Sequence, residues 1–107
     1  MIDWSQLITP ARKAEHAARS AREAWKAERA AQVAAITVTT AAGNVFDGDE
    51  ESQGRMARAV IALQAKGAGA TVNWVLADNS VIAATASELL EALQLAGQAQ
   101  ADVWMSP

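Results

Sequence analysis

The chain has 107 residues, a formal net charge of -3 and no cysteine. This length suits one domain with one core. The lack of cysteine excludes disulfides, thiolate metal sites and a cysteine nucleophile. No apolar run approaches the roughly 20 residues of a membrane-spanning helix. Residues 1–9 have no basic segment before an apolar stretch, so we expect neither a membrane span nor a signal peptide.

The charges are unevenly distributed along the chain. Residues 10–36 carry six basic and three acidic side chains, whereas residues 37–107 carry three basic and eight acidic ones. The first segment therefore has a net charge of +3 and the second a net charge of -5. Such polarity favours contacts between the basic segment and an acidic surface.

The first third of the chain predicts a long helix. Residues 1–9, which include Trp4, are expected to form an extended lead-in. Thr9 followed by Pro10 has the order of a helix N-cap and a proline at the first helical position. Strong helix formers then continue without glycine or proline to about residue 35. We therefore expect a helical arm over residues 10–35, about 39 Å long.

One face of this predicted helix consists almost entirely of alanine. Its members recur at three- and four-residue steps and end at a tryptophan: Ala14, Ala17, Ala18, Ala21, Ala24 and Trp25. Alanine buries little area but permits another helix to approach closely. We interpret the face as a helix contact surface, used in a homo-oligomer or with another protein. The alternative is a mostly solvated helix that docks only at its Val33–Ile36 end.

The next segment predicts a hairpin followed by a helix. Residues 36–40 are rich in β-branched side chains, residues 41–44 favour a turn, and a return strand begins at residue 45. Asp47 and Glu50 have the spacing of a capping box, so a helix is expected over about residues 48–65. The side chains expected in its buried stripe are Met56, Ala59, Val60, Ile61 and Leu63.

The last third predicts the same alternation again. Residues 71–76 alternate with Trp74 on the inward face, residues 77–80 favour a turn, and residues 81–84 return. Thr85 and Glu88 form a second predicted capping box, before a helix over about residues 86–103. Gly97 inside this helix predicts a close helix crossing. The inward side chains are expected to be Leu89, Leu90, Leu93, Ala96 and Val103.

These elements together predict an α+β fold. Residues 1–9 are the lead-in, residues 10–35 the arm, and residues 36–107 a compact domain of two hairpins and two helices. No internal repeat is evident beyond the alternation of hairpin and helix.

No residue pattern favours catalysis, a metal or a cofactor. The acidic run at residues 47–51 lacks the ligand spacing of a calcium loop, and carboxylates at a helix start complement the helix dipole. His16 has no orienting partner or nucleophile near it in the sequence. The basic residues of the arm alternate with glutamates, which disfavours nucleic-acid binding. Trp74 is interpreted as a core residue rather than a ligand-stacking one.

Taken in order, these segments resemble a DUF4376-like domain of unknown biochemical function that occurs in bacteriophage tail-fibre and tail-fibre-assembly proteins. The resemblance covers about residues 20–107 and includes these pieces: Lys26–Arg29, Val45–Asp47, Ser52–Met56, Trp74, Ala77–Ser80 and Ala86–Leu89. Residues 2–10 resemble the linker that precedes this domain in longer members. The family offers no active-site residues.

The resemblance implies a non-catalytic protein of phage assembly. The expected function is a chaperone that binds the tail-fibre chain, and the alternative is a structural subunit of the fibre or baseplate retained in the virion. The implied location is the host cytoplasm during assembly, or the virion tail. The expected partner surface comprises Trp4, Ala14, Ala17, Ala18, Ala21, Trp25 and Trp104. A glycan hydrolase is disfavoured because no pair of carboxylates marks a cleft.

Overall fold

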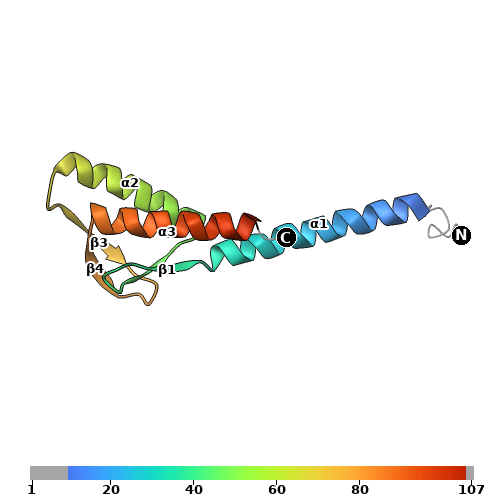
Figure 1. Cartoon of the computed structure of the whole chain (residues 1–107), viewed down its shortest axis with the longest axis horizontal. Coiled ribbons are helices and arrows are strands. Elements are labelled where there is room, and N and C mark those ends of the chain that lie inside the picture. Colours follow the sequence, from blue (N-terminus) through green and yellow to red (C-terminus); the bar gives the residue numbers. More distant parts are fainter. Residues whose placement is uncertain (1–9, 106–107) are drawn as a thin grey trace, which may run out of the picture. The chain divides into compact units, whose positions relative to one another are not determined.

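The structure is a computed structural model that describes residues 10–105, and these residues form an α+β fold (Figure 1). The elements in order are α1 (Pro10–Ala34), β1 (Thr37–Thr39), β2 (Val45–Asp47), α2 (Glu50–Lys66), β3 (Thr71–Val75), β4 (Val81–Thr85) and α3 (Ala86–Met105). The predicted fold class, a long N-terminal helix followed by two hairpins and two further helices, is confirmed. No helix within residues 10–105 has both the length and the apolarity to cross a membrane.

The chain divides into two compact units, and the division falls inside α1. Residues up to Ala30 belong to the first unit and residues from Ala31 onward to the second. The last turn of α1 therefore belongs to the second unit, where Val33 is buried in the core.

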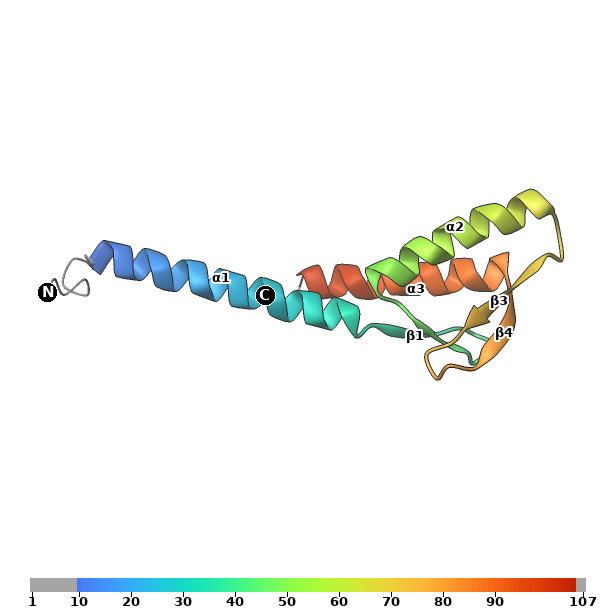
Figure 2. The same cartoon turned by 180° about the vertical axis from the view of Figure 1, so that it is seen from behind.

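In the second unit, α2 and α3 lie side by side and run in opposite directions, with both hairpins on one side of the pair (Figures 1 and 2). The largest fully buried side chains are Phe46 of β2, Met56 of α2 and Leu89 of α3. The rest of the core is Val33, Ile36, Val38, Val60, Leu63, Leu76, Ala84, Ala92 and Ala96. The helices thus cover the inward faces of hairpins that, with two strands each, are marginally stable alone.

Both hairpins turn in the same way. The N–H of Thr40 donates to the carbonyl of Asn44 (3.0 Å), and the N–H of Gly43 donates to the carbonyl of Thr40 (2.9 Å). In the second hairpin, Leu76 donates to Ser80 (2.7 Å) and Asn79 donates to Leu76 (2.9 Å). Gly43 (φ 86°) and Asn79 (φ 69°) hold the left-handed position that a three-residue hairpin loop requires.

This agreement extends over two hairpin–helix units that repeat at an interval of 36 residues. Asp49 is the residue before α2 and Thr85 the residue before α3, 36 positions later. The same interval relates buried Gly48 to Ala84, Met56 to Ala92 and Val60 to Ala96. Few paired positions hold the same residue, Ala41 with Ala77 and Val45 with Val81 among them. The repeat is therefore visible in the structure although the sequence barely preserves it.

The predicted capping boxes are only partly correct. Asp47 lies in β2, so α2 begins two residues later than predicted, and its cap residue Asp49 makes no side-chain capping bond. At α3, the N–H of Glu88 does donate to Oγ1 of Thr85 (3.1 Å). The Glu88 carboxylate does not accept a hydrogen bond from the N–H of Thr85, which would complete the capping box. It instead accepts from the Nδ2 of Asn44 (2.7 Å), because the turn of the first hairpin lies within its reach.

Three side chains predicted to face inward are more exposed than expected. Ile61 of α2 is 67% exposed and Leu90 of α3 is 39% exposed, because the helix pair covers a narrower face than the apolar pattern predicted. Trp74 packs against the core but is only partly buried. Met56, Val60, Leu63, Leu89 and Ala96 are buried as predicted.

The close approach predicted at Gly97 is wrong, since a Cβ added there would meet no heavy atom within 4 Å. The tight position is Gly48, between β2 and α2. A Cβ at Gly48 would lie 2.6 Å from Cγ2 of Ile36 and 3.0 Å from Cβ of Ala96. The N–H of Gly48 also donates to the carbonyl of Ile36 (2.8 Å), which holds the two segments together.

The two glycines therefore predict opposite responses to the same change. Gly48→Ala should lower the free energy of unfolding by about 1–3 kcal/mol, because the methyl group would overpack a filled site. Gly97→Ala should raise it by about 0.5–1 kcal/mol, because alanine favours an open helical position. Urea unfolding of both variants measures this, and a neutral Gly48→Ala would contradict the packing described above.

Candidate functional site

The surface predicted to bind a partner begins on α1. Ala14, Ala17, Ala18 and Ala21 are all exposed, as is every described side chain from residue 11 to residue 28. At about 100° of rotation per residue, these alanines and Trp25 share one face of α1. The charged side chains Arg12, Arg19, Glu23 and Lys26 lie on the opposite side of the helix. The structure thus keeps these five predicted residues together as one uncharged, solvent-facing stripe.

Trp25 is the one large side chain of this stripe and is 39% exposed. The guanidinium carbon of Arg29 lies 4.4 Å from the centroid of its ring, at cation–π distance. This contact covers part of the indole and favours one orientation of the ring on α1. An ordered indole is a suitable anchor for a partner because little conformational entropy remains to be lost on binding.

The remaining predicted tryptophans are not part of this stripe. Trp104 is 53% exposed near the end of α3 and belongs to the second unit. It lines an open cleft of about 410 Å³ together with Gln53, Gly97, Gln100, Ala101 and Met105. Trp4 lies outside the described residues. The described residues that were predicted as one partner surface therefore lie on two units of the chain.

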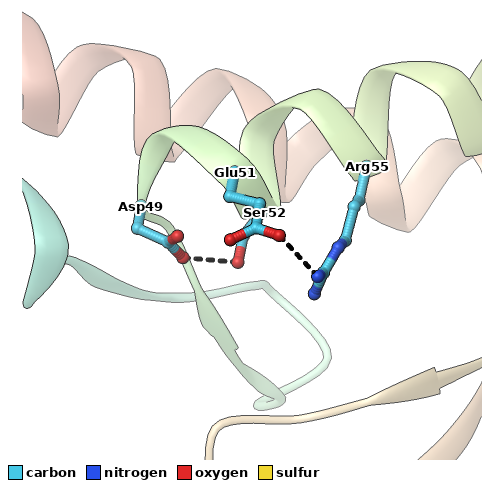
Figure 3. A network of polar contacts seen from close by, with 4 residues as sticks. All are labelled: Asp49, Glu51, Ser52 and Arg55. Carbon is cyan, nitrogen blue, oxygen red and sulfur yellow. Dashed lines mark hydrogen bonds and ion pairs between the residues drawn. The ribbon is translucent and has the colours of Figure 1, made fainter.

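The acidic run at the start of α2 takes part in a hydrogen bond and an ion pair. The Oγ–H of Ser52 donates to Oδ1 of Asp49, and Nη2 of Arg55 pairs with Oε1 of Glu51 at 2.7 Å (Figure 3). Within residues 10–105, no group of three or more His, Cys, Asp or Glu side chains could hold a metal ion. The hydrogen bond from Ser52 holds the pKa of Asp49 below its ordinary value, and the charge of Arg55 acts in the same direction.

A second surface was missed by the sequence analysis. A groove of about 290 Å³ lies between β2, β3 and the start of α2, and we call it the β2–β3 groove. Its lining residues are Asp47, Ser52, Arg55, Asn73, Trp74, Val75, Leu76 and Asn79. No local sequence pattern marks it, because its lining comes from β2, α2, β3 and the turn that follows β3.

The α2 network predicts an effect of pH on stability. Because the folded pKa of Asp49 lies below its ordinary value of 3.8, its carboxylate stabilises the fold above that pH. This contribution is lost as the pH falls through the folded pKa. Ser52→Ala should therefore raise the pKa of Asp49 and make stability less sensitive to acid. NMR titration of the carboxyl carbon measures this, with Ser87→Ala in the first turn of α3 as the control. An unchanged Asp49 pKa in Ser52→Ala would contradict the assignment.

Comparison with known proteins identifies the family of the chain without assigning an activity. The sequence profile of a domain of unknown function, DUF4376, matches residues 12–104. Neither the curated proteins nor the solved structures contain a match. The match extends from the first turn of α1 to the end of α3, which is most of the chain. The protein therefore belongs to the DUF4376 family of domains of unknown function.

Proposed function

We propose that this protein is a non-catalytic accessory factor of bacteriophage tail-fibre assembly, which binds the fibre chain in the host cytoplasm. The phage association rests on the resemblance of the sequence to domains of tail-fibre and tail-fibre-assembly proteins. The observation that supports binding is the exposed stripe of α1, which consists of Ala14, Ala17, Ala18, Ala21 and Trp25.

The stripe is suited to a transient contact with another chain. Exposed alanines cost a free protein little, and a long alanine-rich helix is supported by its own propensity. A second helix can approach such a surface closely, while Trp25 supplies a large apolar anchor. The net charge of +3 over residues 10–36 would in addition favour an acidic surface on the fibre chain. The same stripe could pair two copies of this protein, and the first experiment below separates the two partners.

A second candidate function is a structural subunit retained in the fibre or baseplate. The observation that favours it is the apolar end of α3, where Trp104 is 53% and Met105 is 84% exposed. Two separate apolar surfaces on one small chain would suit a permanent place between larger subunits.

Ala21→Glu tests the stripe directly. We expect it to weaken binding to the co-expressed fibre subunit by about tenfold or more, because a charge would be buried in the contact. Its thermal stability should change by less than about 0.5 kcal/mol, because the position is exposed.

The matched control for this experiment is Ala27→Glu, the same change on an exposed residue of α1 that lies off the stripe. Light scattering of the protein without the fibre subunit shows whether the stripe pairs two copies instead. Equal fibre binding by the two variants would exclude the stripe from the fibre contact.

Purified phage particles distinguish the two candidate functions. An assembly factor that leaves after fibre maturation should be present in the lysate of infected cells and absent from particles. Quantitative mass spectrometry against the fibre subunit measures this. A fixed ratio of the protein to the fibre subunit in particles would instead support the retained structural subunit.

A further inference from the structure

We propose that the β2–β3 groove binds an extended polypeptide segment of a partner through one arginine or lysine side chain. This inference does not depend on the phage function or on α1. It rests on the two repeats, on the unpaired strand edges beside the groove, and on the charges that line it.

At the first hairpin, the place equivalent to the groove is closed by two glutamates of α3, the helix of the other repeat. Oε1 of Glu88 accepts from Oγ1 of Thr40 (3.0 Å) and from Nδ2 of Asn44 (2.7 Å). Oε2 of Glu91 accepts from the N–H of Ala41 (2.7 Å). These three hydrogen bonds join the first turns of α3 to the turn of the first hairpin.

The second hairpin lacks this closure. The residues 36 positions before Glu88 and Glu91 are Ser52 and Arg55 of α2, which bond to Asp49 and Glu51 instead. Within the described residues, neither side chain hydrogen-bonds to the turn of the second hairpin. The groove of about 290 Å³ is the space left between them and β3. Side chains of α3 thus fill the place beside the first hairpin, whereas the equivalent place between α2 and the second hairpin remains a groove.

Two unpaired strand edges border this space. Leu76 and Ser80 form a hydrogen-bonded pair, and hydrogen-bonded pairs alternate with non-hydrogen-bonded pairs along an antiparallel ladder. The main-chain N–H and C=O of Trp74 therefore point toward β4. Those of Asn73 and Val75 point away from β4, on the free edge of β3. By the same reasoning, from the bond between Gly48 and Ile36, the main chain of Asp47 lies on the free edge of β2. The two edges meet where the N–H of Ala77 donates to the carbonyl of Val45 (3.0 Å).

The free edge of β3 has no charged residue and no proline, which usually prevent strand addition, whereas the edge of β2 carries the charged Asp47. A row of free N–H and C=O groups at strand spacing is complementary to another extended main chain rather than to a compact small molecule. We therefore assign the ligand as a polypeptide segment.

The charges beside the groove favour a cation. Its carboxylate, Asp47, is exposed and makes no hydrogen bond or ion pair within the described residues. Its one cation, Arg55, is already paired with Glu51. The lining also includes Trp74, whose indole can bind a cation at its face. A volume at the lower end of the range for ligand sites suits one long side chain rather than a large ligand.

The test uses the full-length, isotopically labelled protein and a blocked pentapeptide with the order threonine, valine, arginine, valine, threonine. We expect saturable NMR shifts of the Asn73 and Val75 amides and of the Trp74 indole. Two matched peptides replace the arginine with citrulline, its neutral isostere, or with glutamate. Both should bind at least about fivefold more weakly, because the charge that faces Asp47 is lost or reversed.

A pair of variants locates the interaction. Asp47→Asn should reduce the affinity for the arginine peptide by about fivefold or more, whereas Asp102→Asn, the same change on α3, should leave it unchanged. The comparison of peptides needs no variant, so it holds even if Asp47→Asn disturbs the fold. Equal binding of the citrulline peptide, no saturable shift with the arginine peptide, or unaltered affinity in a folded Asp47→Asn would each overturn the proposal. Shifts of the same residues with a neutral oligosaccharide but not with the peptide would also overturn it.

Discussion

The second unit depends on the burial of two narrow hairpins beneath one pair of helices. A two-stranded sheet has too little surface to be stable by itself, and each hairpin here has only three or five residues in a strand. Phe46, Met56 and Leu89, which are fully buried, join a strand and both helices in one core. The tight contact of Gly48 with Ile36 and Ala96 sets how closely the chain passes under these helices.

The repeat explains why one core serves two hairpin–helix segments, and it makes the differences between their surfaces apparent. Two hairpin–helix segments present equivalent buried positions to a shared core, and few of their residues are the same. Where the surfaces differ, the local chemistry differs as well. Glu88 and Glu91 attach one hairpin turn to α3, whereas Ser52 and Arg55 leave the β2–β3 groove open. Whether the place beside each hairpin is closed or open is thus set by residues outside the buried core.

Much of the fold could be predicted because its signals are local. The limits of α1, the two turns and the stripe of Met56, Val60 and Leu63 follow from helix propensity, turn residues and periodicity. The errors arose where packing or strand pairing, rather than the local residue pattern, decided the outcome. Aspartate is a favoured N-cap residue, but Asp47 lies in β2 because it pairs with Thr37 of β1. Gly97 has the composition of a crossing point, but no neighbour reaches it. Of the candidate site, the stripe on α1 could be predicted from residue spacing, and the groove could not.

By itself, the sequence determined the α+β class, the order of the elements and an uncharged stripe on the long helix, because each depends on residues close together in the chain. Only the tertiary structure decided that the hairpin–helix pattern is a 36-residue repeat, that Gly48 is the tight position, and that α3 closes the first hairpin while α2 leaves the second open. Those features depend on side chains that meet across long stretches of the chain, such as Gly48 with Ala96 and Thr40 with Glu88, each pair 48 positions apart. Local propensity carries no information about such meetings, since it acts over a few residues only.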